Sequence, residues 1–163
     1  MRTLTGQRAV FFLQAAEPQT LAHALTDSPV GWLAWMIGKF QLLTDNDDDF
    51  LTAVDRDTCL TDVTLYWVTD TVGSAMRIYR ENRLTEEEVA PTPRLETPVA
   101  YADFPREVAV PPFRWITQTY NVVQITEMPK GGHFAALEQP DLLLDDIRKF
   151  FATVDQKQAE IVP

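Results

Sequence analysis

The sequence predicts an α/β protein with a helical first part and a second part in which two β-strands alternate with helices. Residues 1 to about 90 are dominated by stretches typical of helices. Residues 91–163 contain two β-type runs, 97–101 and 122–126, with a helical stretch after each. Because parallel strands need a crossover connection, the order strand, helix, strand, helix predicts parallel pairing.

The helical part begins with a mixed segment and a short apolar stretch, Gln19–Leu25. Ser28-Pro29 then predicts a helix start, because serine favours the N-cap and proline the first helical position. The following helix, 30–43, is largely apolar, which predicts burial on more than one side. The acidic run 44–49 ends it, and we expect a solvated loop there, because a calcium loop would need a central glycine and a closing glutamate. Further helices are expected over 58–69 and 72–82.

A polar, proline-containing stretch, 86–93, predicts a boundary between a helical region at 1–90 and a strand-containing region at 91–163. In the second region we expect helices over 113–120 and 140–151. Two parallel strands do not make a stable sheet, and parallel sheets are normally covered on both faces. The second region is therefore expected to be the edge of a larger sheet, which indicates that the chain is incomplete.

Charge and composition argue against several classes of function. The chain has 14 basic and 24 acidic residues, a net charge of −10, which disfavours binding to nucleic acid or to anionic membranes. With two histidines and no CxxC or HExxH spacing, we expect no metal site, and no cofactor is expected. The single cysteine, Cys59, forms no internal disulfide. With neither a membrane span nor a signal peptide in the sequence, we expect a cytoplasmic protein.

One candidate for a catalytic base is His133, which follows the second apolar strand. Functional residues of open α/β sheets lie at the carboxyl ends of the strands, and Gly131-Gly132 allow a sharp turn there. A histidine base needs a partner that fixes its tautomer. Asp103 and Glu107 both follow the preceding strand, and by chemistry alone either could serve. The alternative interpretation is a histidine that only caps the turn, with two ordinary loop carboxylates.

The motifs FPREV (104–108) and GGHFAALEQPDLLLDDIRKFF (131–151) resemble the end of α/β-hydrolase epoxide hydrolases of the microsomal type. In that family the acid of an F-P-x-[ED] motif pairs with the histidine of GGHFAA-x-E-x-P. The resemblance thus implies Glu107 as the acid and His133 as the base, with Asp103 as the second choice. QAAEPQTLAHALTDSPVGWLAWMIGKF (14–40) resembles the opening of the family's cap, and LYWVTDTVGSAMRIYREN (65–82) its later helices.

The resemblance covers residues 13–152 and implies a partial α/β-hydrolase fold: a helical cap, then the last two parallel strands with their covering helices. It implies hydrolysis of a small-molecule epoxide to a diol in two steps. An aspartate attacks the epoxide to form an ester while cap tyrosines, here Tyr79, donate hydrogen bonds to its oxygen. Water activated by the histidine then hydrolyses the ester. Without the family, Tyr79 reads as boundary packing on an amphipathic helix.

Some parts of the family's pattern have no match in this sequence. We find neither the aspartate elbow nor the H-G-x-P loop, and the slot of the second cap tyrosine holds Val10. We therefore expect an epoxide hydrolase fragment that is inactive alone. The alternatives are one subunit of a split hydrolase, completed by a separate N-terminal half or by a homo-oligomer, and a non-catalytic relic that binds a small molecule.

Overall fold

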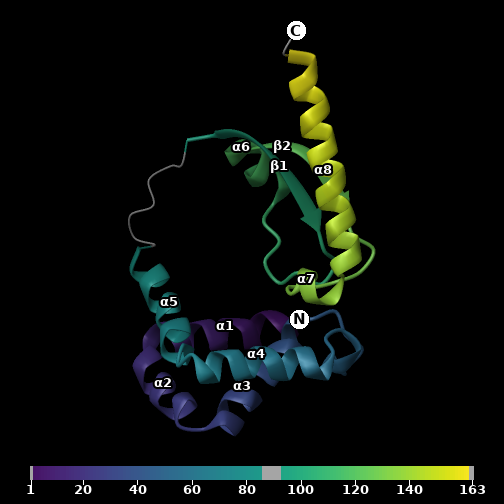
Figure 1. Cartoon of the computed structure of the whole chain (residues 1–163). Helices are drawn as coiled ribbons and strands as arrows, with labels where there is room; N and C mark the ends of the chain where they lie inside the picture. The colour runs from purple at the N-terminus through teal and green to yellow at the C-terminus, as the bar shows by residue number, and fades with distance from the viewer. Residues whose placement is uncertain (1, 86–92, 162–163) are drawn as a thin grey trace. The chain divides into compact units, whose positions relative to one another are not determined.

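The structure, a computed structural model, describes residues 2–85 and 93–161 (Figure 1). The helices of the first part are α1 (Arg2–Ala16), α2 (Pro18–Thr26), α3 (Pro29–Leu43), the short 3-10 helix η1 (Phe50–Thr52), α4 (Arg56–Val68) and α5 (Val72–Thr85). The second part consists of β1 (Leu95–Asp103), α6 (Phe113–Thr119), β2 (Tyr120–Glu127), α7 (Ala135–Glu138) and α8 (Pro140–Ile161). The expected helices and both expected strands are present, with ends that differ by a few residues.

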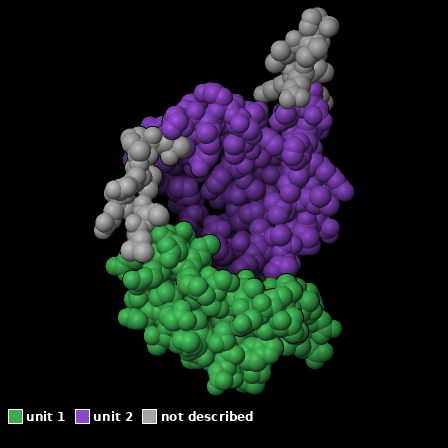
Figure 2. Space-filling model, turned by 60° about the vertical axis from the view of Figure 1, so that its left-hand side comes forward, with its two compact units in different colours: residues 1–42, 46–90 green, residues 43–45, 91–163 purple. Residues whose placement is uncertain are grey.

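The chain divides into two compact units, coloured separately in Figure 2. Unit 1 comprises Met1–Leu42 and Asn46–Ala90, and unit 2 comprises Leu43–Asp45 and Pro91–Pro163. The expected boundary stretch, 86–93, lies outside the described residues except for Pro93. Leu43, the last residue of α3, and the two residues after it thus belong to unit 2, although the residues on both sides of them belong to unit 1.

Unit 1 is a bundle of helices around a small apolar core. Trp32, Val63, Val72 and Met76 form the buried cluster, and the ring of Tyr66 lies 5.2 Å from that of Trp32. α5 packs against α1 and α2. The start of α3 is capped as expected, because the N–H of Gly31 donates to Ser28 Oγ at 3.0 Å. The packing of these helices, more than their individual propensities, stabilises such a bundle.

Unit 2 contains the two strands, which pair in parallel as expected. Val99 lies opposite Val122, and Asp103 lies opposite Glu127, so both strands end at the same edge of the sheet. α6 forms part of the crossover between them, and α8 packs against β1. Since His133 and Glu107 follow the carboxyl ends of β2 and β1, this topology brings their loops to one edge.

Two stretches of helix exceed the sequence expectation. α1 lies in the part expected to be helical, but no separate helix was delimited there, because its apolar residues do not gather on one side and give no periodic signal. α8 continues ten residues past the expected end at Phe151. Its last turns are polar and rich in good helix formers, so propensity extends the helix where no apolar stripe marks it.

The expectation of a solvated loop at 44–49 is wrong for part of that run. Thr44 is 7% exposed, and the Asp45 side chain is 25% exposed and hydrogen-bonded within unit 2. Asp49 caps η1 by accepting the N–H of Leu51 at 3.0 Å. A run of acidic residues does not show which of its carboxylates will accept hydrogen bonds in the folded chain. The sequence therefore could not distinguish Asp45 from its exposed neighbours.

Candidate active site

His133 and Glu107 form a hydrogen-bonded pair in unit 2. The imidazole Nδ1 lies 2.9 Å from Glu107 Oε1 and 3.2 Å from Oε2. The His133 side chain is 44% exposed and that of Glu107 is 29% exposed. A carboxylate at Nδ1 stabilises the tautomer with a proton on that nitrogen and leaves Nε2 free to accept one. The pair therefore has the arrangement of a base and its orienting acid.

The Glu107 carboxylate is held by backbone donors as well as by the imidazole. The N–H groups of Val108 and Ala109 donate to Oε1 at 2.5 and 3.2 Å. Burial raises the pKa of Glu107, but the hydrogen bond from His133, the two backbone hydrogen bonds and the charge of the imidazole outweigh it. The net result is a pKa below the ordinary glutamate value, so the acid is ionised at neutral pH.

The loop that carries His133 needs glycine at the two preceding positions. Gly131 has a φ of +116°, and a Cβ there would lie 2.7 Å from Phe104 Cδ1. A Cβ on Gly132 would lie 2.8 Å from the carbonyl oxygen of Leu43. The N–H of His133 donates to that same oxygen at 3.0 Å. The loop is thus in close contact with the backbone of the 43–45 segment.

The two other residues that the sequence analysis singled out are Asp103 and Tyr79. Asp103 lies at the end of β1 and lines a hollow of about 570 Å³ together with Tyr101, Phe113, Ile125 and Glu127. Among the described residues, no hydrogen bond or ion pair links the Asp103 side chain to His133. Tyr79 belongs to unit 1, where it is half-buried and its ring lies 5.8 Å from that of Phe11. Its geometry is therefore described within unit 1 alone.

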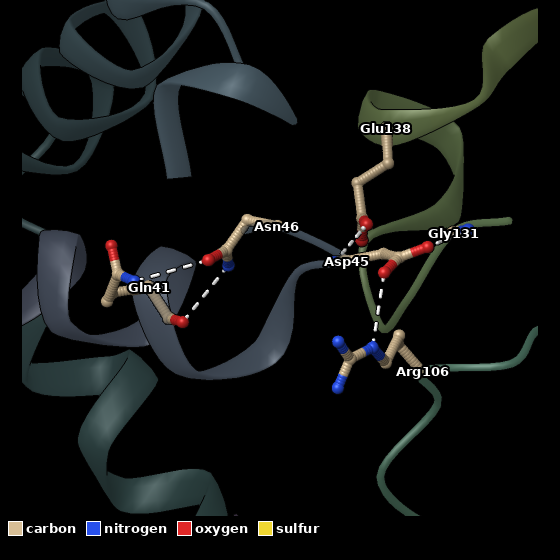
Figure 3. A network of polar contacts seen from close by, with 6 residues as sticks. All are labelled: Gln41, Asp45, Asn46, Arg106, Gly131 and Glu138. Atoms are coloured by element: carbon tan, nitrogen blue, oxygen red, sulfur yellow. Dashed lines mark hydrogen bonds and ion pairs between the residues drawn. The ribbon is translucent and has the colours of Figure 1, made fainter. Parts of the chain in front are cut away.

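Two acidic residues near the pair were not singled out from the sequence. Figure 3 shows Asp45 between Arg106, Gly131 and Glu138, with hydrogen bonds to each. Glu138 is 7% exposed and lies in α7, directly after the histidine loop. It occupies the glutamate position of the GGHFAALEQP motif, which is the one signal that could have indicated it. Asp45 has no comparable signal, because its partners are distant in the sequence.

Within residues 2–85 and 93–161, no group of three or more histidine, cysteine, aspartate or glutamate side chains is arranged to hold a metal ion. Over the same residues, every helix is too short or too polar to cross a membrane.

Comparison with known proteins finds a relative and solved structures that are similar to this chain over most of its length. No family model matches the chain. It is 35% identical over 167 residues to epoxide hydrolase 1 of Sus scrofa, covering 95% of this chain and 36% of the relative. The juvenile hormone epoxide hydrolase structure from the silkworm Bombyx mori matches with a TM-score of 0.84 and 26% identity, over 96% of this chain and 42% of that one. An enantioselective mutant of the Aspergillus niger epoxide hydrolase gives a TM-score of 0.75 and 30% identity, over 93% and 38%.

The parallel strands, the helices that follow them and the paired loops are those of the C-terminal part of an α/β-hydrolase fold. Within that fold the chain corresponds to the C-terminal part of epoxide hydrolases. It spans between about a third and two fifths of the length of the relatives it matches.

Proposed function

We propose that this chain supplies the base, its orienting acid and one oxygen-binding tyrosine of an epoxide hydrolase. The substrate class is a small-molecule epoxide, and the product is the vicinal diol. The observation that supports the proposal most directly is the 2.9 Å hydrogen bond between His133 Nδ1 and Glu107 Oε1. It joins the two residues that the family motifs single out, across 26 positions of sequence.

In the proposed reaction, His133 acts on the ester formed when a carboxylate opens the epoxide. Nε2 takes a proton from water, and the resulting hydroxide attacks the ester carbonyl. The bond between the carbonyl carbon and the diol oxygen breaks, the imidazolium gives its proton to that oxygen, and the diol leaves. The carboxylic acid that remains releases its proton, which restores the carboxylate. Glu107 holds the Nδ1 proton and stabilises the imidazolium while the proton is on the ring. The nucleophile would come from the part of the relatives' length that this chain does not span.

Tyr79 is proposed to act one step earlier. A phenol is a neutral donor that can stabilise the alkoxide as the epoxide carbon–oxygen bond breaks. Within unit 1, its ring lies at a steep angle to that of Phe11, with the ring centroids 5.8 Å apart. Because Val10 stands where a second tyrosine is expected, Tyr79 would carry more of the stabilisation than one member of a pair.

The test is a chimera in which this chain replaces the matching region of the Sus scrofa relative. We expect the chimera to convert styrene oxide to its diol, and His133→Gln to abolish diol release while the covalent ester accumulates. Glu107→Gln should lower turnover by roughly 10² to 10⁴-fold, as for loss of acid–base catalysis. Tyr79→Phe should slow ester formation by about 10²-fold, as for loss of one oxyanion donor.

Two controls distinguish this proposal from the alternatives. His23→Gln removes the other histidine, which lies on α2 in unit 1, and should leave turnover unchanged. Asp103→Asn tests the second candidate for the acid and should have a smaller effect than Glu107→Gln. A folded chimera that forms diol equally fast with and without His133 would contradict the proposed role of the histidine.

A further inference from the structure

Asp45 connects three groups around the histidine loop. Its Oδ2 accepts the N–H of Gly131 at 2.9 Å, and its Oδ1 accepts the Nε–H of Arg106 at 3.2 Å. Its own N–H donates to Glu138 Oε2 at 2.7 Å (Figure 3). Gly131 and Arg106 are themselves joined, because the N–H of Arg106 donates to the carbonyl oxygen of Gly131 at 3.1 Å. Asp45 thus holds the position two residues before His133 and the position next to Glu107.

Glu138 holds the other side of the same loop. Its Oε1 accepts the N–H of Phe134 at 2.9 Å, and its Oε2 accepts the N–H of Asp45. The backbone N–H of His133 is bound by Leu43. The N–H groups of Gly131, His133 and Phe134 therefore all donate to the 43–45 segment or to Glu138. These three bonds lie on both sides of the imidazole-bearing residue.

The chemistry of these contacts requires carboxylates. Each of the two acids accepts hydrogen bonds at both oxygens and donates none through its side chain. An amide in the same place would turn an NH₂ group towards an N–H donor, leaving one donor without an acceptor. Burial increases the cost of losing this hydrogen bond, because a buried N–H donor without an acceptor cannot bind water instead. Glu138 is 7% exposed, so the argument applies to it most strongly.

The ends of the segment are fixed within unit 1. Gln41 Nε2 donates to Asn46 Oδ1 at 3.2 Å, and Asn46 Nδ2 donates to the carbonyl oxygen of Gln41 at 3.1 Å. The N–H of Phe50 donates to Gln41 Oε1 at 3.2 Å. These bonds close the base of the loop from which Leu43–Asp45 extends (Figure 3). The segment is therefore constrained at both of its ends.

From this network we infer that Asp45 and Glu138 are positioning residues, which hold the His133 imidazole within hydrogen-bonding distance of Glu107. The inference rests on the proposed function, because it assigns a purpose to a pair that is itself proposed to be catalytic. Within the described residues, neither acid forms a hydrogen bond or ion pair with the imidazole. Both act through the backbone of residues 131–134, which determines where the Nδ1 atom lies relative to Glu107.

The test uses ¹⁵N-labelled 163-residue chain and the imidazole nitrogen resonances of His133, assigned with His23→Gln. At about pH 8.5, where an ordinary imidazole is neutral, the pairing with Glu107 should favour the Nδ1–H tautomer. We expect Asp45→Asn and Glu138→Gln to lower the ratio of the Nδ1–H to the Nε2–H tautomer several-fold. Asp47→Asn, which removes an exposed charge from the same acidic run, should leave the ratio unchanged.

The outcomes separate the inference from the proposed function. Glu107→Gln must also lower the ratio; if it does not, the His133–Glu107 pair is not formed in solution and the proposed function loses its main support. If Glu107→Gln lowers the ratio and both Asp45→Asn and Glu138→Gln leave it unchanged, only the positioning role is overturned. Should these two variants fail to fold, Arg106→Met decides the matter. Its side chain is 62% exposed, so the chain should fold, and an unchanged ratio there would overturn the inference.

Discussion

At the level of single residues, backbone N–H groups supply most of the hydrogen bonds to the carboxylates of the candidate site. Glu107 accepts two of them, Glu138 accepts two and Asp45 accepts one. A hydrogen bond to an ionised acceptor is shorter and stronger than one between neutral groups. The carboxylates of the site therefore find their hydrogen-bond donors within the fold itself.

The pH dependence of stability should report on Glu107. Its pKa is lower in the folded chain than the ordinary value of about 4.3, so its charged form stabilises the fold above that value. This contribution is lost as the pH falls through the lower, folded pKa. We expect the urea midpoint of the wild type to fall more steeply below about pH 4.3 than that of Glu107→Gln. Glu127→Gln serves as the control, and identical slopes for wild type and Glu107→Gln would contradict the prediction.

Gly132 and Gly38 should respond in opposite ways to the same substitution. A Cβ on Gly132 would lie 2.8 Å from Leu43 O and 3.0 Å from Asp45 N, both backbone atoms, whereas a Cβ on Gly38 meets nothing within 4 Å. Gly132→Ala should destabilise the chain by about 1–3 kcal/mol through overpacking. Gly38→Ala, inside α3, should stabilise it by about 0.5–1 kcal/mol. Urea unfolding measures the free energy of unfolding of both variants. A Gly132→Ala variant as stable as the wild type would show that the 43–45 segment moves to accommodate the added methyl group.

At the level of elements, local signals and long-range contacts contribute differently to what could be predicted. The start of α3 at Ser28-Pro29 and the parallel pairing of β1 and β2 follow from capping chemistry and connection rules, and both are confirmed. α1 has no apolar stripe, and the sequence did not indicate its bounds within the helical part. Segments whose state depends on packing against the rest of the chain give no local pattern to detect.

α8 contains two adjacent aspartates with different environments. Asp146 is 4% exposed and accepts hydrogen bonds from Gln124 Nε2 at 2.9 Å and Thr126 Oγ1 at 2.5 Å, both on β2. Asp145 is exposed and lies 3.5 Å from Arg148. Helical geometry places Asp146 on the inner face with Leu143 and Phe150, at spacings of three and four residues. The sequence pair does not show which aspartate binds the strand, because both letters are the same.

Replacing each of these aspartates in turn should separate the two roles. Asp146→Ala removes the acceptor of the Thr126 hydroxyl and leaves Gln124 Nε2 with only the backbone carbonyl of residue 146. It should lower the free energy of unfolding by about 1–3 kcal/mol. Asp145→Ala removes only an exposed ion pair and should change it by less than about 1 kcal/mol. Guanidinium denaturation followed by circular dichroism measures the difference. Equal effects of the two substitutions would mean that α8 is not held to β2 through Asp146.

At the level of the whole molecule, the candidate site could be predicted in part. The motif residues His133 and Glu107 are close in the structure, while the role proposed for Tyr79 stays a prediction. The supporting network could not be predicted, because Asp45 lies 61 residues from Arg106 and 86 from Gly131 in the sequence. A short motif identifies the residues proposed to take part in the chemistry. The residues that position them are distant from one another in the sequence, so only the three-dimensional structure shows them.

The activity of the isolated chain is the remaining prediction at this scale. Catalytic groups that act as a unit lose most of their rate when one is missing, and the proposed His133–Glu107 pair needs an ester to hydrolyse. We therefore expect the 163-residue chain to form diol from styrene oxide no faster than its own His133→Gln variant, as measured by chromatography. The chimera with the Sus scrofa relative should form diol in a His133-dependent reaction. Diol formation by the chain alone that depends on His133 would mean that a carboxylate within these residues serves as nucleophile, and Asp103, at the end of β1, would then be the first to replace.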